Sequence, residues 1–115
     1  MALQQIFEPN PGILGTSVAP ELLYWVSSNL EAGTTFLLID LKNTTRVDSS
    51  GLGTLMIAYN RVRRVGGTLA LCSLHPDVRL SIERAGLLEK FDLYTDRREF
   101  ENFVSGDDDL HRYAL

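Results

Sequence analysis

A run of small polar residues stands where an apolar, strand-like segment gives way to a long helical pattern: Asp48-Ser49-Ser50-Gly51-Leu52-Gly53. Asp48 or Ser49 can accept hydrogen bonds from the first free N–H groups of that helix. Capping accounts for one polar residue but not for Gly51 and Gly53, because each glycine weakens a helix by about 0.5–1 kcal/mol relative to alanine. Small residues here leave the first turn open to close approach by another molecule.

The chemistry that this segment can host is the binding or carrying of negative charge. A helix N-terminus stabilises anions through its free N–H groups and its dipole. The segment is therefore suited to a bound phosphate, or to a phosphoryl group attached covalently to Ser49 or Ser50.

The chain lacks the further residues that enzyme sites with a similar segment require. Gly51-Leu52-Gly53 is an incomplete dinucleotide fingerprint, no Walker A lysine is present, and no serine stands in the G-x-S-x-G order. Of the two histidines, His75 precedes Pro76 in an expected loop and His111 lies in the C-terminal tail. No histidine, cysteine and carboxylate cluster has metal-ligand spacing. We therefore expect no catalytic residue, no metal site and no cofactor.

Composition and charge place the chain among ordinary globular domains. Its 115 residues, 44% apolar and 23% charged, suffice for one domain around a single core. A formal net charge of −4 argues against direct nucleic-acid binding. The lone Cys72 excludes an internal disulfide and is expected to be a small buried hydrophobe. The sequence shows no signal-peptide pattern, and its apolar runs are far shorter than the about 20 residues of a membrane span. A cytoplasmic protein without membrane insertion is therefore expected.

The elements that must position the segment follow from hydrophobic periodicity. Residues 2–7 predict a short strand, residues 9–12 a turn, and Ile13-Leu14 either a second edge strand or the end of the first. Pro20 opens a helix that ends at Gly33, with an apolar face of Leu22, Leu23, Val26 and Leu30. The near-continuous apolar run at 35–41 predicts a strand covered on both faces, and residues 42–45 a polar turn.

A helix of about four turns follows the polar segment, because its apolar residues recur at helical spacing. Its core stripe is expected to be Leu52, Leu55, Met56, Tyr59 and Val62, and Gly66-Gly67 ends it. Residues 68–72 read as the next buried strand. A helix between two strands that are both fully apolar predicts a parallel βαβ unit with a right-handed crossover.

The remaining elements complete an α/β fold with a single domain. Pro76 opens a helix in which Val78, Ile82 and Ala85 share a face and which Gly86 ends. A short strand is expected around 91–94, then a last helix with Asp96 and Glu99 as a capping box. That helix carries Phe100, Phe103 and Val104. The tail from Ser105 is expected to be frayed.

The outer face of the long helix is expected to form part of an interface, and it presents Gly53, Ile57, Asn60, Arg61 and Arg64. Ile57 is the apolar member of an otherwise polar face, although single exposed apolar residues are also common without any partner. The basic residues Arg61, Arg63 and Arg64 equally suit a solvated helix end that complements the dipole.

Several segments of the chain together resemble the STAS-domain anti-sigma-factor antagonists of bacteria. They are the hexapeptide at 48–53, the long helix, Gly66-Gly67, the strand at 69–72 and the later Arg84-Ala85-Gly86-Leu87-Leu88. The resemblance covers about Gly12 to Phe103. It implies a small, mostly parallel sheet of four to five strands with about four helices. The STAS domain would span residues 1–104, with a flexible tail at 105–115.

The same resemblance implies a function and a site. The serine after the aspartate, here Ser49 with Ser50 as second choice, would be phosphorylated by a partner that is both a serine kinase and an anti-sigma factor. The unphosphorylated protein would bind that partner and free the sigma factor, and a PP2C-type phosphatase would reverse the modification. Residues expected to bind the partner are Asp48, Ser49, Ser50, Gly51, Gly53, Ile57, Asn60 and Arg61.

One position departs from the family pattern. Members usually carry an acidic residue shortly after the first strand, where this chain has Gly15. Two other functions remain open: a STAS subunit of a transport assembly, and a small module that binds a phosphorylated or nucleotide ligand at the Ser49 helix end.

Overall fold

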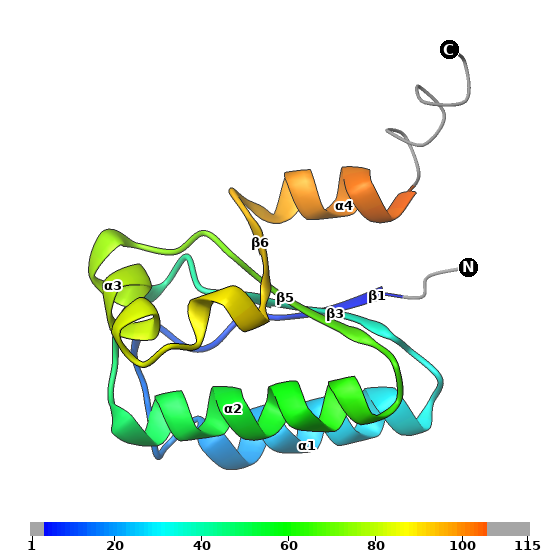
Figure 1. Ribbon diagram of the computed structural model, residues 1–115, viewed down its shortest axis with the longest axis horizontal. Helices are drawn as coiled ribbons and strands as arrows, with labels where there is room; N and C mark the ends of the chain where they lie inside the picture. The colour runs from blue at the N-terminus through cyan, green and yellow to red at the C-terminus, as the bar shows by residue number, and fades with distance from the viewer. Residues whose placement is uncertain (1–3, 106–115) are drawn as a thin grey trace.

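Four α-helices and six strands alternate along residues 4–105, the part of the chain that the computed structural model describes (Figure 1). The elements are β1 (Gln4–Phe7), β2 (Gly12–Leu14), α1 (Ala19–Glu31), β3 (Phe36–Asp40), β4 (Thr44–Val47), α2 (Ser49–Arg64), β5 (Thr68–Cys72), α3 (Pro76–Arg84), a short 3-10 turn η1 (Leu88–Lys90), β6 (Asp92–Tyr94) and α4 (Arg97–Ser105). The start of the strand predicted from residue 2 lies outside the described residues. So does the tail predicted from Ser105, except for Ser105 itself, which is the last residue of α4 and is helical.

The main sheet has the strand order β1-β3-β5-β6, and every pair in it is parallel. β3 and β5 pair from Phe36 opposite Thr68 to Asp40 opposite Cys72. Both strands are almost wholly buried, as their continuous apolar runs require when helices cover both faces of a sheet. The predicted βαβ unit around α2 is therefore confirmed.

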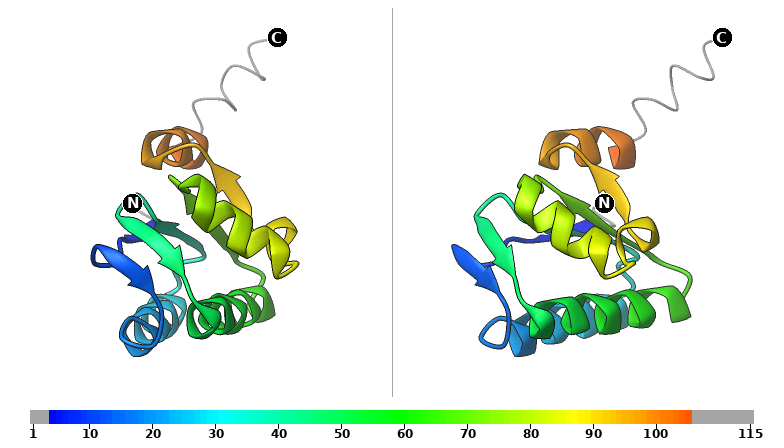
Figure 2. Two further views of the ribbon diagram at one scale, coloured as in Figure 1. Left: turned by 90° about the vertical axis from the view of Figure 1, so that its left-hand side faces the viewer. Right: turned by 60° about the vertical axis from the view of Figure 1, so that its left-hand side comes forward.

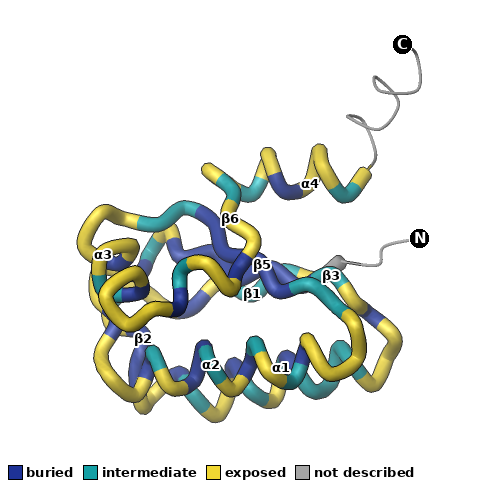
Figure 3. The backbone as a smooth tube through the Cα atoms, viewed as in Figure 1, coloured by how far each residue is buried: buried dark blue, intermediate teal, exposed yellow. Residues whose placement is uncertain are grey.

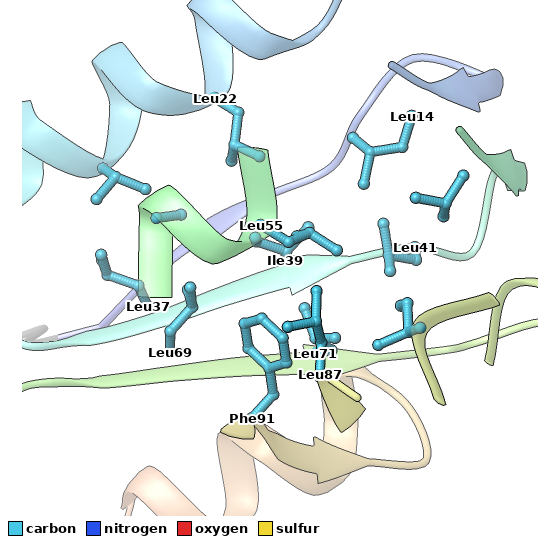
Figure 4. Packing of buried hydrophobic residues seen from close by; sticks show 14 of the residues in the cluster. Leu14, Leu22, Leu37, Ile39, Leu41, Leu55, Leu69, Leu71, Leu87 and Phe91 are labelled. Carbon is cyan, nitrogen blue, oxygen red and sulfur yellow. The ribbon is translucent and has the colours of Figure 1, made fainter. Parts of the chain in front are cut away.

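Helices cover the two faces of this sheet unequally. α1, α2 and α3 pack on one face and α4 alone on the other (Figures 1 and 2). The larger core lies under the three helices, where Leu55 of α2 joins Ile39 and Leu71 of the sheet (Figure 4). From α3, Ile82 belongs to the same core. Leu55, Ile39, Leu71 and Ile82 are fully buried.

The opposite face holds a smaller cluster of Leu38, Ala70, Cys72 and Phe100. The predicted cap of α4 is confirmed in part, since Asp96 Oδ1 accepts a hydrogen bond from the Glu99 amide at 2.9 Å. The return bond differs from a standard capping box, because Glu99 Oε1 accepts from the amide of Thr95 rather than from that of Asp96, at 2.6 Å.

The predicted apolar faces of α2 and α3 are confirmed in large part. In α2, Leu55 and Val62 are fully buried, and the predicted Leu52, Met56 and Tyr59 are half-buried and pack against the same core. The predicted stripe omitted Ala58, which is also buried. In α3, the predicted Ala85 is exposed, because the helix ends one residue before it. Most of α4 is exposed (Figure 3).

The polar turn predicted at residues 42–45 is wrong in its second half. Thr44 begins strand β4, which pairs in parallel with β2 to form a separate two-stranded sheet (Figure 2). Thr44 and Val47 are buried while the two residues between them are exposed. This pattern lacks a continuous apolar run, so periodicity alone gave no strand signal. Ile13-Leu14 is confirmed as part of a second strand.

The small sheet fixes the start of α2 through one carbonyl. The oxygen of Leu14 accepts a hydrogen bond from the Asp48 amide at 3.2 Å. The same carbonyl lies against Gly51, where an added Cβ would overlap the oxygen and come within 2.8 Å of the carbonyl carbon. Gly53, two residues on, has nothing within 4 Å of its Cβ position.

These two glycines therefore make a matched pair for measuring the contact. Gly51→Ala should destabilise the fold by about 1–3 kcal/mol, because the strain of overpacking exceeds the gain in helix propensity. Gly53→Ala should stabilise it by about 0.5–1 kcal/mol, because alanine favours the helix and meets no neighbour. Urea unfolding of both variants measures the difference; equal stabilisation by the two would show that Leu14 does not constrain α2.

Candidate functional site

The N-terminus of α2 is capped by Asp48, one of the two capping residues that the sequence allows. Asp48 has extended backbone angles of φ −94° and ψ −178°, and its Oδ1 accepts a hydrogen bond from the Gly51 amide at 2.9 Å. This geometry satisfies one of the free N–H groups that begin a helix. Of the two predicted capping candidates, Asp48 therefore takes the role and leaves Ser49 free of it.

Asp48 in turn rests against the buried Gly15. A Cβ at position 15 would come within 2.9 Å of Asp48 Oδ1 and within 2.8 Å of its Cγ. Any side chain at position 15 would thus displace the carboxylate that caps α2. The acidic side chain that the family resemblance places near this position is absent, and the Asp48 carboxylate occupies the adjoining space.

The two serines of the segment lie in different surroundings, although both are exposed. Ser50 Oγ accepts a hydrogen bond from Thr16 Oγ1 at 3.1 Å, and the Ser50 carbonyl accepts one from Thr54 Oγ1 at 2.8 Å. Within residues 4–105 the Ser49 side chain makes no hydrogen bond. Ser49 therefore presents the freer hydroxyl of the pair.

The exposed predicted residues share one side of α2. Ser49, Gly53, Ile57 and Asn60 recur at helical spacing and are all exposed, with Ile57 44% exposed. They form an α2 outer stripe that begins at the free serine. Ile57 provides its apolar member.

Two predicted partner-binding residues are engaged within the fold. Gly51 is buried against Leu14, so its small size serves internal packing and not the approach of another molecule. Arg61 is half-buried and its guanidinium NH1 donates to Ser27 Oγ of α1 at 2.9 Å and to the Leu23 carbonyl at 3.4 Å. Arg61 therefore ties α2 to α1.

Sequence reasoning missed the neighbours that long-range pairing brings to the site. Thr16 lies beside Ser50, and the small sheet pairs Ile13 with Arg46, both of them exposed. The chain separates Ile13 from Arg46 by more than thirty positions. Only the parallel register of β2 with β4 joins them, and no local pattern indicates that register.

The remaining nucleophile and histidine candidates lie elsewhere. Cys72 is fully buried, as predicted, and burial together with the nearby Asp40 raises the pKa of its thiol to about 12 despite a hydrogen bond from Ser73. His75 Nε2 lies 2.8 Å from the Lys42 carbonyl oxygen, and His111 lies outside the described residues. Within residues 4–105 no three His, Cys, Asp or Glu side chains are grouped to hold a metal ion.

None of the helices in the described part of the chain is both long and apolar enough to span a bilayer.

Two curated relatives are named for anti-sigma factors. An anti-sigma F factor antagonist of Paenibacillus polymyxa is 33% identical over 58 residues, which is 50% of each chain. A putative anti-sigma factor antagonist of Bordetella bronchiseptica, BtrV, is 28% identical over 86 residues, 75% of this chain and 74% of that protein. The match thus spans half the length of the first relative and about three quarters of the second.

Solved structures with the same fold include two anti-sigma factor antagonists and one sulfate transporter family protein. A putative anti-sigma factor antagonist from Thermotoga maritima has a TM-score of 0.80 at 23% identity, covering 91% of this chain and 90% of that one. A sulfate transporter family protein from Wolinella succinogenes has a TM-score of 0.77 at 17% identity, covering 84% and 80%. The unphosphorylated anti-sigma factor antagonist SpoIIAA has a TM-score of 0.75 at 20% identity, covering 90% and 89%.

Because these structures are less than 25% identical to the chain, their likeness shows the fold alone. The family match, by contrast, rests on the sequence. The STAS domain family matches residues 11–100, which include both strands of the small sheet and the whole of α2. The chain belongs to the STAS domain family.

Proposed function

We propose that this chain is an anti-sigma factor antagonist that works by partner switching. In its unphosphorylated form it binds an anti-sigma factor that is also a serine kinase, and phosphorylation of Ser49 releases that partner. The observation that carries the proposal is the exposed Ser49 hydroxyl, which makes no hydrogen bond within the described residues and begins the capped helix α2. The names of the two curated relatives support the choice of partner.

Ser49 is preferred to Ser50 for a physical reason as well as by resemblance. Phosphorylation of Ser50 would have to break the hydrogen bond that its Oγ accepts from Thr16. It would also place a bulky dianion against the loop that leads into α1. Ser49 has neither constraint, so a kinase can reach its hydroxyl without rearranging the site.

The fold should tolerate the modification. A phosphoryl group adds about −1.5 to −2 charges, and negative charge at a helix N-terminus is favourable by about 0.3–1 kcal/mol. The neighbouring Asp48 carboxylate opposes part of this gain, because it lies next in the chain and carries the same sign. These effects are small and opposite, so the modification should act on the partner and not on the fold.

The partner surface would centre on the α2 outer stripe. A neutral hydroxyl at Ser49 and the apolar side chain of Ile57 suit a closely fitted protein interface, whereas a desolvated dianion does not. A penalty of a few kcal/mol weakens binding by about a hundredfold or more, since each 1.4 kcal/mol is tenfold. Arg61 contributes by holding α1 beside this stripe.

The remaining parts of the switch come from the family resemblance. A PP2C-type phosphatase would remove the phosphate and restore binding to the anti-sigma factor. This cycle takes place in the cytoplasm, where a sigma factor is available, and needs neither direct nucleic-acid contact nor a catalytic residue in this chain.

A transport role is the second candidate, because the sulfate transporter family protein shares the fold at a TM-score of 0.77. Its 17% identity carries the likeness no further than the fold. A ligand-binding role is less supported: three surface pockets of 310, 360 and 310 Å³ take none of their lining residues from 48–53.

Affinity capture from a lysate of the native host tests the proposal. The wild type and Ser49→Ala should retain the same kinase-like partner, while Ser49→Asp should lose it by about a hundredfold or more because of the added charge. Thr35→Asp is the matched charge control, since Thr35 is exposed and its carbonyl accepts from Thr68, beyond the C-terminal end of α2.

Phosphosite mapping of the same protein completes the experiment. Phosphate on Ser49 together with loss of the partner in Ser49→Asp supports partner switching. Recovery of transporter subunits with no phosphate on either serine would contradict it, as would equal binding by Ser49→Asp and Thr35→Asp.

A further inference from the structure

The second face of the main sheet is thinly covered. Among residues 4–105, α1, α2 and α3 share one face, whereas the other is covered by the nine residues of α4 (Figure 1). Phe100 is the only fully buried residue described in α4, and most of the helix is exposed (Figure 3). Elements with few buried apolar contacts open at lower free energy than the core of a domain.

One side chain at the start of α4 provides all of its ion pairs among the described residues. Arg97 NH2 lies 3.0 Å from Asp40 Oδ2 at the end of β3 and 2.8 Å from Glu8 Oε1, just after β1. The Asp40 side chain is only 1% exposed, and its two oxygens accept from this guanidinium and from the Lys42 amide. Loss of one member of a buried pair leaves the other charge uncompensated.

After Arg97, α4 is held by aromatic contacts of Phe100 and Phe103 with Tyr94. Tyr94 packs edge-on against Phe100, with ring centroids 5.4 Å apart, and meets Phe103 at 5.9 Å. Phe103 is itself 42% exposed. Among the described residues of α4, none after Arg97 forms an ion pair. Among the described residues, the closed position of α4 thus depends on the packing of Phe100, with Val104 beside the same cluster, and on the Arg97 pairs.

We propose that α4 is a releasable cover, latched by Arg97 to Asp40 and Glu8, that opens while the core beneath α1, α2 and α3 stays folded. The two buried clusters lie on opposite faces of the sheet, so α4 can leave one face while the packing on the other is kept. Opening would uncover Leu38, Ala70 and Cys72 on the second face of the sheet. The domain would then have a second state, distinct from unfolding, that exposes a new apolar surface.

Cys72 is a built-in reporter of this opening. It is the only cysteine in the chain and lies fully buried in the cluster with Phe100. Burial raises the pKa of its thiol, so a disulfide reagent such as DTNB reacts with it only after the site opens.

The first measurement is the DTNB labelling rate of the full chain at increasing urea concentrations. At low urea, labelling should depend weakly on urea, because releasing α4 exposes less surface than global unfolding. Near the unfolding transition the dependence should steepen. A single steep dependence from zero urea, with the slope of global unfolding, would overturn the proposal.

Variants then separate the cover from the main core. Arg97→Gln should raise the labelling rate without urea by about tenfold or more, because it breaks the latch. Arg98→Gln, the same change one residue on at an exposed position without an ion pair among the described residues, should leave the rate within about twofold.

Leu55→Ala in α2 provides the decisive contrast. It should lower the urea midpoint of global unfolding yet leave labelling without urea unchanged, because the open state keeps the core around Leu55. If Cys72 were reached only through global unfolding, Leu55→Ala and Arg97→Gln would both accelerate labelling in proportion to their loss of stability. That result would contradict a separately opening α4.

Discussion

The contact between the Leu14 carbonyl and the first turn of α2 is the constraint on which the site depends. This carbonyl accepts the Asp48 amide and leaves no room for a side chain at Gly51. With α2 held there, the Asp48 carboxylate fits between Gly15 and the Gly51 amide and caps the helix. Ser49, the next residue after the cap, is exposed to solvent. A backbone contact thus fixes the helix end that carries the proposed phosphorylation site.

The residues that fix the helix differ from those exposed to solvent. Gly15, Asp48 and Gly51 take part in internal packing and capping, whereas Ser49, Gly53 and Ile57 are exposed. Because the first group already satisfies the helix end, a charge added to Ser49 need not perturb it. Under the partner switching proposed above, the switch could therefore reset quickly, since neither state would require refolding. This division gives the hexapeptide a physical rationale that capping alone does not provide.

Local patterns predicted those features that are encoded locally. The continuous apolar runs gave the central strands, and the capping preference of aspartate gave the start of α2. The strand β4, the role of Gly51 and the contact of Arg61 with α1 were not predictable, because each depends on a residue more than thirty positions away. A glycine at position 51 predicts a first turn open to another molecule, but the structure shows that the Leu14 carbonyl requires it. Thr16 likewise distinguishes Ser50 from Ser49, because it donates a hydrogen bond to the Ser50 hydroxyl from a distant part of the chain.

The most direct test of this account is a comparison of backbone amide NMR spectra of the protein with and without phosphoserine at position 49. If the modification acts at the surface alone, shift changes should be confined to residues 12–17 and 48–53, and the Gly51 amide should stay protected from hydrogen exchange by Asp48. Shift changes throughout the sheet and the core under α1, α2 and α3, or loss of protection at Gly51, would contradict it. In that case the phosphate would act by altering the fold.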